Sequence, residues 1–298
     1  MSVDVRDDIH LLAPAYLPRV GQTANFVCAA VALLLSCARK FNDNLRNDIM
    51  CLECGCGEIE HSHTGHSHAG HSHAHDHAHD HGEVRTLTLG KKILEHNDQH
   101  AAENRAWLAK RGVVAINIIS SPGTGKTTLL ERTLEILKGE IQCAVIAGDQ
   151  RSDNDAKRLR DKGAPVCQIE TGNACHLDAV QVGDMLPEVV RDGVKLLFIE
   201  NVGNLICPSA FDLGENFKVA LLSSTEGEDK PVKYPALFSR VPVAVLTKMD
   251  LVPHLEWDVA RCRDCLRQVR PGVFIFELSA RTGDGMDAWI EYLKKLVA

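Results

Sequence analysis

The stretch Ser120–Thr127, SSPGTGKT, decides the fold of this chain. It follows the apolar run 113–120, VVAINIIS, which is typical of a buried strand, and it opens the helical pattern 127–137. A glycine-rich turn between a strand and a helix, ending in Gly-Lys-Thr, is the setting that a phosphate-binding loop requires. One departure is visible, because Ser120 stands where the pattern G-x-x-x-x-G-K-[ST] has its first glycine.

This loop also predicts how the phosphates of a nucleotide are held. Backbone N–H groups of the loop and of the helix N-terminus face the phosphates, and Gly123 and Gly125 allow the backbone to approach them closely. Lys126 is expected to reach the β- and γ-phosphates, and Thr127 is expected to hold Mg²⁺. The same loop supplies three further expected nucleotide contacts, Ser121, Thr124 and Thr128.

Outward from this loop, strand-like and helical patterns alternate to the end of the chain. One helix is expected before the first strand, at 91–111. Strands separated by helices predict an α/β fold of the P-loop NTPase class, with a mostly parallel sheet and helices on both faces. The further expected elements are strands at 143–147, 166–169, 195–200, 217–222, 243–246 and 273–278, and a final helix at 286–297.

The residues 247–250, TKMD, follow a predicted strand, as the guanine-specifying N-K-x-D motif does. A carboxylate at Asp250 can accept hydrogen bonds from both N1–H and the exocyclic amine of guanine, a donor pair that adenine lacks. Lys248 and the small-residue loop at Ser279 and Ala280 complete the expected base site. Together these residues favour GTP over ATP, whereas TKMD alone would be interpreted as an ordinary helix start.

Two acidic residues are candidates for arranging Mg²⁺ or the attacking water. Glu200 ends the run 195–200 and begins ENVG, at the point where GTPases carry a D-x-x-G sequence. Asp149 follows the predicted strand 143–147. With Lys126, these two acids are the candidate catalytic residues.

The N-terminal part of the chain carries a different chemistry. Ten of the fifteen histidines fall within 61–81, and the sequence CLECGCG occupies 51–57. Neutral imidazoles and thiolates are ligands for nickel, zinc and copper. Residues 50–83 are therefore predicted to be a low-complexity metal-binding segment, disordered without metal, ahead of a GTPase domain at 84–298. The expected ligands are Cys51, Cys54, Cys56, His61, His63, His66, His68, His71, His73, His75, His77, His79 and His81.

Composition narrows the class of protein. A net charge of −7 without a Lys/Arg block gives no reason to expect nucleic acid, and the apolar run 26–38 is too short to span a bilayer. Eleven cysteines without a regular framework fit a reducing compartment, so a cytoplasmic protein is expected. Residues 1–49 are otherwise uninformative, and Met50 directly before Cys51 leads to the hypothesis that translation starts there.

Seven segments of the chain stand out as motifs. They are CLECGC, the histidine tract, ILEHNDQHAAENRAWL, SSPGTGKTTLLE, TGNACHLDA, IENVGNLICP and LTKMDL. Together they resemble the HypB family, the nickel-incorporating GTPases of [NiFe]-hydrogenase maturation. The resemblance covers about 50–298 and implies a SIMIBI-type P-loop GTPase fold and slow, Mg²⁺-dependent hydrolysis of GTP to GDP and phosphate. It also implies a GTP-dependent homodimer, a HypA-type nickel accessory protein and the hydrogenase large subunit as partners.

The resemblance further implies two kinds of metal site. The motif C-x-x-C-G-C binds nickel with help from the N-terminal amine, which agrees with a start at Met50. A second site in the GTPase domain takes nickel or zinc through Cys175 and His176 of NACHLD and Cys207 of NLICP. Cys207 lies seven residues after Glu200, so GTP loading is expected to move its loop and release or pass nickel. Taken alone, Cys207 would be interpreted as a small buried residue.

The other cysteines and histidines give weaker signals. Cys143 and Cys167 lie in strand-like runs and are expected in the core. Cys262 and Cys265 form a C-x-x-C within a predicted helix, but no second pair is near enough in sequence to complete a zinc site. The remaining residues of this kind, expected at the surface, are His96, His100 and His254.

The sequence thus predicts a GTP-hydrolysing nickel metallochaperone whose histidine tract stores nickel. One alternative is a passive nickel or zinc store with a vestigial GTPase domain, which a lack of GTP turnover would favour. Another is a urease-type or cobalt/zinc GTPase chaperone of the same fold. The C-x-x-C-G-C motif argues against this second alternative, while the histidine tract does not.

Overall fold

The computed structural model describes residues 82–149 and 154–298. Within these residues the chain forms one seven-stranded sheet in which every pairing is parallel. All seven predicted strands are confirmed, with ends that differ by at most two residues. They are β1 (Val114–Ser120), β2 (Cys143–Asp149), β3 (Val166–Glu170), β4 (Leu196–Glu200), β5 (Phe217–Ser223), β6 (Val243–Thr247) and β7 (Phe274–Glu277).

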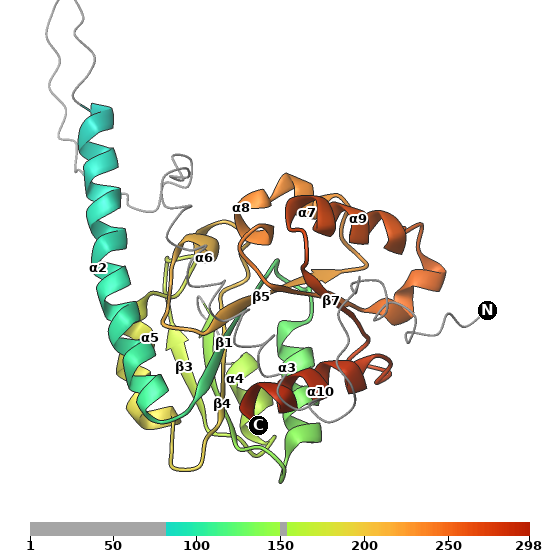
Figure 1. Ribbon diagram of the computed structural model, residues 1–298, viewed down its shortest axis with the longest axis horizontal. Coiled ribbons are helices and arrows are strands. Elements are labelled where there is room, and N and C mark those ends of the chain that lie inside the picture. Colours follow the sequence, from blue (N-terminus) through green and yellow to red (C-terminus); the bar gives the residue numbers. More distant parts are fainter. Residues whose placement is uncertain (1–81, 150–153) are drawn as a thin grey trace, which may run out of the picture.

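Helices connect these strands and cover both faces of the sheet (Figure 1). The predicted helices at 91–111, 127–137 and 286–297 are confirmed as α2, α3 and α10, although α2 begins well before its predicted start. The described helices are α2 (Gly82–Lys110), α3 (Lys126–Leu137), α4 (Asn154–Arg160), α5 (Ala179–Val189), α6 (Cys207–Ala210), α7 (Lys230–Lys233), α8 (Pro235–Phe238), the 3₁₀ helix η2 (Met249–His254), α9 (Val259–Val269) and α10 (Met286–Val297).

The core is divided between the two faces of the sheet. Ile116 and Ile118 of β1 pack with α3, α4 and α10 on one face. Ala115 packs with α2 and α5 on the opposite face, where Ile119 meets α8 and α9. Successive strand residues point to opposite faces, so a strand covered on both sides is apolar throughout. This explains the unbroken run VVAINIIS in the sequence.

Strand order places the phosphate-binding loop at the centre of the sheet. The order is β3-β2-β4-β1-β5-β6-β7, so β1 lies between β4 and β5. The strand that follows β1 in the sequence, β2, lies on the β4 side of β1, whereas β5 lies on the opposite side. In open parallel sheets, ligands bind beyond the carboxyl ends of the strands at such a reversal. The loop after β1 therefore lies where this fold class places its ligands.

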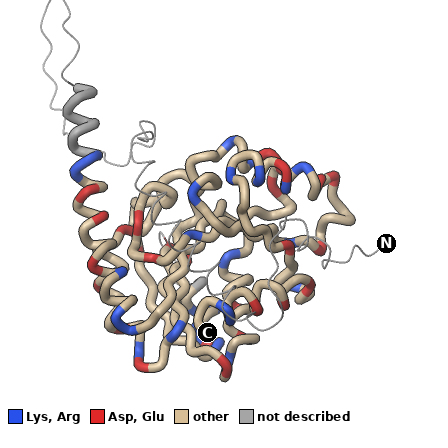
Figure 2. Tube along the Cα trace, viewed as in Figure 1, with Lys and Arg blue, Asp and Glu red and all other residues tan. Residues whose placement is uncertain are grey.

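Helix α2 stands at the edge of the domain. Its carboxyl-terminal half packs against α5, and its first turns extend away from the body of the molecule (Figure 1). Figure 2 shows both basic and acidic residues along the coloured part of the helix, with acidic residues in its middle and basic residues toward its carboxyl end, which suits an element with one solvated face. Among the described residues, no helix is both long and apolar enough to cross a membrane.

Candidate functional site

The phosphate loop, residues 120–127, is shaped by two glycines with left-handed backbone. Gly123 has φ 72° and Gly125 has φ 102°, values that other residues rarely adopt. Ser120, which replaces the first glycine of the pattern, is fully buried, and its Oγ lies 3.2 Å from the donating Nζ of Lys126. The serine thus takes part in placing the lysine, so the departure from the pattern leaves the loop intact.

An acid from the neighbouring strand meets the threonine that follows the lysine. The Oγ1 of Thr127 donates to Oε1 of Glu200 over 2.7 Å, and Glu200 is buried at the end of β4. Both groups present oxygen atoms, which are the ligands that Mg²⁺ prefers, so the pair fits this ion. Asp149 ends β2, the strand next to β4, and also lies at the carboxyl edge of the sheet.

The TKMD segment contacts the phosphate loop directly. The Oγ1 of Thr247 donates to the carbonyl oxygen of Thr124 over 2.7 Å. Lys248, with φ 57°, stretches its Nζ to the carbonyl oxygen of Gly123, also at 2.7 Å. Asp250 follows in the first turn of η2. Thr247 stands where the guanine-specifying N-K-x-D motif has asparagine. Its hydrogen bond to Thr124 therefore connects this motif to the phosphate loop.

The loop after β7 lies beside this segment. The N–H of Met249 donates to the carbonyl oxygen of Leu278 over 3.3 Å, which brings Ser279 and Ala280 next to the TKMD segment. Ser279 is buried, and its Oγ accepts from the N–H of Thr282. Thr247 and Lys248 thus contact the middle of the phosphate loop, and the loop after β7 lies next to the segment that carries them.

The other predicted ligands also converge. The ligand atoms of Cys175, His176 and Cys207, here called the inner cluster, all lie within 4.8 Å of one another. Cys175 and His176 are half-buried, and Cys207 is buried at the start of α6. Burial lowers the pKa of His176, an effect that the nearby Asp178 opposes only in part. A neutral imidazole between two sulfur atoms fits a borderline ion such as Ni²⁺ or Zn²⁺.

Comparison with known proteins identifies the family. Residues 114–277 match the family model described as CobW/HypB/UreG, nucleotide-binding domain. The hydrogenase maturation factor HypB of Escherichia coli K12 is 50% identical over 210 residues, which cover 70% of this chain and 72% of that protein. The chain belongs to the HypB family.

Two solved HypB structures share the fold. The HypB structure from Archaeoglobus fulgidus has a TM-score of 0.65 and 38% identity, covering 69% of this chain and all of that one. The HypB structure from Helicobacter pylori, solved in complex with nickel, has a TM-score of 0.64 and 35% identity, covering 67% and 94%. The fold class predicted from the sequence is therefore confirmed for this HypB-family chain.

A buried polar network joins the two parts of this HypB-family site. Asn201, which directly follows Glu200, accepts through Oδ1 from the N–H of Leu177, the residue after His176, over 3.2 Å. Its Nδ2 donates to Oδ1 of Asn117 over 3.2 Å. Asn117 in turn donates to Oε1 of Glu215 over 3.4 Å. The segment that reaches Thr127 thus also contacts the loop that carries Cys175 and His176.

Helix α2 fixes the inner cluster from outside. Asn97 accepts from the N–H of Ala179 over 2.9 Å and donates to the carbonyl oxygen of Asp212 over 2.8 Å. Asn104 donates to the carbonyl oxygens of Ala179 and Leu213. Arg105 donates to both carboxylate oxygens of Asp212, at 2.6 and 2.7 Å. The helix therefore bridges the segments that follow His176 and Cys207, a role that the sequence did not reveal.

The segment after β5 also contacts the phosphate loop, which the sequence did not predict. The Oγ1 of Thr124 donates to Oε1 of Glu226 over 2.7 Å, and Lys230 donates to Ser121 over 2.7 Å and to Glu226. Burial opposes ionisation of Glu226, but the hydrogen bonds from Lys230 and Thr124 outweigh it and hold its pKa below the ordinary value. The run EGEDK was visible in the sequence, but nothing in it showed which loop it contacts.

The other described cysteines differ from the inner cluster in their surroundings. Burial raises the pKa of Cys143 and Cys262 to about 12 and that of Cys167 to about 11, so these thiols stay protonated. Cys143 and Cys167 are core residues, as predicted. Cys262 is fully buried in α9 and Cys265 is half-buried. The predicted ligands Cys51, Cys54, Cys56 and the ten histidines of 61–81 lie outside the described residues.

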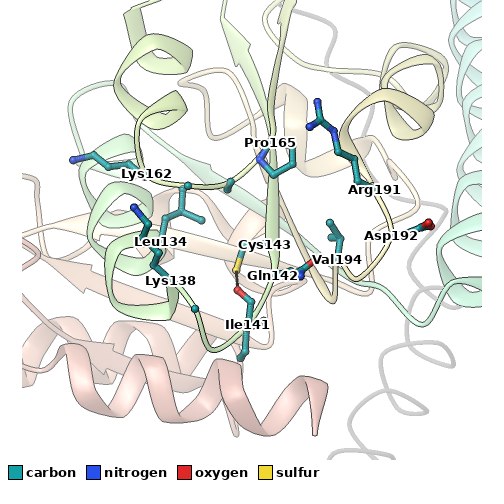
Figure 3. Close-up of a pocket in the computed structure, with 13 residues that line it drawn as sticks. Leu134, Lys138, Ile141, Gln142, Cys143, Lys162, Pro165, Arg191, Asp192 and Val194 are labelled. Carbon is teal, nitrogen blue, oxygen red and sulfur yellow. Dashed lines mark hydrogen bonds between the residues drawn. The ribbon is translucent and has the colours of Figure 1, made fainter.

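One cleft lies far from these groups. It has a volume of about 400 Å³ and is lined at its base by Cys143, Pro165 and Val194 (Figure 3). Cys143 begins β2, and the other two residues precede β3 and β4, so the cleft opens at the amino ends of the strands. The phosphate loop lies at the opposite edge of the sheet, so this cleft is separate from the candidate site.

Proposed function

We propose that this HypB-family protein is a cytoplasmic, GTP-hydrolysing nickel metallochaperone that delivers nickel during [NiFe]-hydrogenase maturation, with storage in its histidine tract. The observation that carries the proposal is the pair Glu200 and Asn201. The first residue bonds to Thr127 in the phosphate loop, and the second bonds to Leu177 in the loop that carries two ligands of the inner cluster. A nucleotide and a metal ion bound at these places are connected through two consecutive residues.

In the proposed nucleotide site, Lys126 steadies the β- and γ-phosphates, and Thr127 and Glu200 hold Mg²⁺. The bound ion supplies charge neutralisation for the phosphates. Asp149 and Glu200 orient the attacking water at the carboxyl edge of the sheet. Asp250 selects guanine by accepting from N1–H and the exocyclic amine, while the bond from Lys248 to Gly123 keeps the base segment against the phosphate loop.

The proposed coupling follows from the hydrogen bond between Thr127 and Glu200. A bound Mg²⁺ would be held by the Thr127 hydroxyl and the Glu200 carboxylate in place of the bond between them, so the position of the Glu200–Asn201 segment would depend on the nucleotide state. Gly203 in the same segment lies close to the phosphate loop, because a Cβ on it would come within 3.1 Å of Pro122. Movement of this segment changes the spacing between Cys207 and the Cys175–His176 pair.

The partners of the proposal follow from the family. We propose a GTP-dependent homodimer that acts with a HypA-type accessory protein and the hydrogenase large subunit. The nickel complex of the Helicobacter pylori relative supports nickel as the cargo. Two thiols and one imidazole leave room for a further ligand on a four-coordinate ion, as transfer to a partner requires.

An anaerobic nickel titration of the full-length protein tests the proposal. Nickel occupancy of the inner cluster, GTP turnover and the mass of the complex are followed with GDP, with a non-hydrolysable GTP analogue and without nucleotide. Protection of His176 from chemical modification reports the inner cluster separately from the histidine tract. We expect Mg²⁺-dependent turnover, a dimer with the GTP analogue, and a nickel affinity of the inner cluster that differs between the two nucleotides. Absence of turnover and of nucleotide affinity would instead favour a passive metal store.

A further inference from the structure

Two histidines on α2 form a pair that the proposed function does not use. His96 and His100 lie four residues apart, and their ring centroids are 4.7 Å apart in an edge-to-face arrangement at 60°. Residues at positions i and i+4 are neighbours on one face of a helix. Zinc-binding helices use the same spacing to direct two imidazoles at one ion. The sequence suggested only that both residues lie at the surface.

A carboxylate orients one ring of this pair. The Nδ1 of His100 lies 3.1 Å from Oε2 of Glu103, one turn further along the helix. When Nδ1 carries the proton and donates it to the carboxylate, Nε2 presents a lone pair outward. A carboxylate hydrogen-bonded to the second ring nitrogen is the usual support of a metal-binding histidine, because it fixes the tautomer and raises the basicity of the ligand. The pair therefore has the support that a ligand needs.

The pair is accessible to ions in solution. His96 is exposed, and the side chain of His100 is 36% exposed. Of the two lysines on the preceding turn, Lys91 pairs with Glu95 over 4.0 Å, and Lys92 lies four residues before His96 on the same face of the helix. An ion at this place would meet two imidazoles and water at the surface of the helix, and no rearrangement of the core is required.

The helix turn that carries the pair is hydrogen-bonded to the segments that flank the inner cluster. Asn97, the residue after His96, bonds to Ala179 and Asp212, which flank the two loops of the inner cluster. Toward the N-terminus, α2 begins at Gly82, directly after His81. The fifteen helical residues from Gly82 to His96 span about 22 Å. In the sequence, the pair thus lies between the histidine tract and the residues of the inner cluster.

We propose that His96 and His100 form a separate, exchangeable site on α2 for a borderline divalent ion, with Ni²⁺ as the ion tested and Glu103 as the residue that positions His100. Two imidazoles and water hold an ion less tightly than two thiolates and an imidazole, so the site exchanges metal faster than the inner cluster. Its use as a transfer station between the tract and the inner cluster rests on the proposed nickel function.

Residue-resolved footprinting tests this site in the full-length protein, where bulk titration would report mainly the histidine tract. Diethyl pyrocarbonate modifies free imidazoles, and mass spectrometry reports each histidine separately. In a NiCl₂ series, we expect His96 and His100 to be protected together with one midpoint. His254, an exposed histidine near the end of η2, is the internal control and is expected to react equally at every nickel concentration.

Three variants sharpen the test. His100→Ala is expected to weaken the nickel protection of His96 by at least about tenfold, and Glu103→Gln is expected to weaken it by less than that. Gln99→Ala, on the exposed face of the same turn, should leave the protection unchanged. Equal modification of His96 with and without nickel, or protection of His96 that survives His100→Ala, would overturn the proposal.

The same spectra separate this proposal from the proposed function. His176 reports the inner cluster, because nickel bound there protects its imidazole as well. Protection of His176 without protection of His96 contradicts the α2 site alone. Protection of His96 without protection of His176 supports the α2 site and contradicts nickel binding at the inner cluster.

Discussion

The phosphate loop and the inner cluster are built in opposite ways. The phosphate loop uses contiguous residues whose shape is fixed by Gly123 and Gly125. The inner cluster joins Cys175 and His176 to a residue far along the chain, Cys207. Asn201, which follows β4, and residues of α2 bond to the loops that carry these ligands. A contiguous site depends mainly on its own residues, whereas a composite site depends equally on residues that touch no ligand. The predictions below test this contrast.

The largest effect is expected from Lys126→Ala. This change removes the cation that steadies the β- and γ-phosphates, so we expect GTP turnover to fall at least about 100-fold. Nickel binding at Cys51, Cys54 and Cys56 should remain, because that segment is separate in sequence. Phosphate release and nickel stoichiometry are measured together, with Lys138→Ala at the exposed end of α3 as the control. Parallel loss of both activities would contradict the separation of the sites.

Removing a thiol from the inner cluster is expected to have the second largest effect. Cys207→Ala deletes one of three proposed ligands, and we expect nickel affinity at this cluster to fall more than about 100-fold, since loss of a mere supporting residue costs about 10–100-fold. GTP turnover without metal should change little. Nickel protection of His176 from diethyl pyrocarbonate reports binding at this cluster, and Cys265→Ala is the matched control. Unchanged protection of His176 would exclude Cys207 as a ligand.

A residue that touches neither ligand is expected to break the coupling. Asn201→Ala leaves the N–H of Leu177 and the amide of Asn117 without their present partner, which costs about 1–3 kcal/mol in free energy of unfolding. We expect the ratio of the nickel affinities measured with GDP and with a GTP analogue to fall by up to about tenfold, toward a ratio of one. Asn173→Ala, exposed in the loop that carries Cys175, is the control. Coupling that persists in Asn201→Ala would show that it follows another route.

The smallest effect is expected from breaking the ion pair between Arg105 of α2 and Asp212. Arg105→Ala removes the Nη2 group that donates to both carboxylate oxygens of Asp212 in a partly solvated ion pair, so we expect the free energy of unfolding to fall by about 1.5 kcal/mol. Nickel affinity at the inner cluster should fall severalfold while GTP turnover stays constant. Denaturant unfolding and nickel titration measure both quantities. The control is Arg111→Ala, whose guanidinium stacks on Trp107 at the exposed end of the same helix. Equal losses in the two variants would show that α2 stabilises the domain without positioning the cluster.

The sequence anticipated most of the fold because each element carries a local signal. The apolar run before Ser120 and the alternation of strand and helix patterns predicted all seven strands and three helices correctly. It underestimated the length of α2, since the residues before position 91 lack a helical apolar pattern. Site residues within one motif, such as Lys126 and Thr127, could also be predicted from spacing.

The residues that connect motifs could not be predicted in this way. Asn117 lies in the middle of an apolar strand, where the sequence gives no reason for a polar side chain, and only its bonds to Asn201 and Glu215 explain it. The same holds for Glu226, whose bond to Thr124 joins the segment after β5 to the phosphate loop. Such contacts depend on strand order, which local patterns do not encode.

The sequence by itself determined the class of fold, the phosphate loop and the types of ligand atom, because hydrophobic period, glycine backbone freedom and side-chain chemistry are local properties. Tertiary structure alone decided that Cys207 meets Cys175 and His176, that Asn201 links them to the nucleotide edge, and that α2 holds both loops. The physical reason is that the parallel pairings of β3 with β2, β2 with β4 and β4 with β1 bring distant segments to one edge of the sheet, where buried polar groups must find partners.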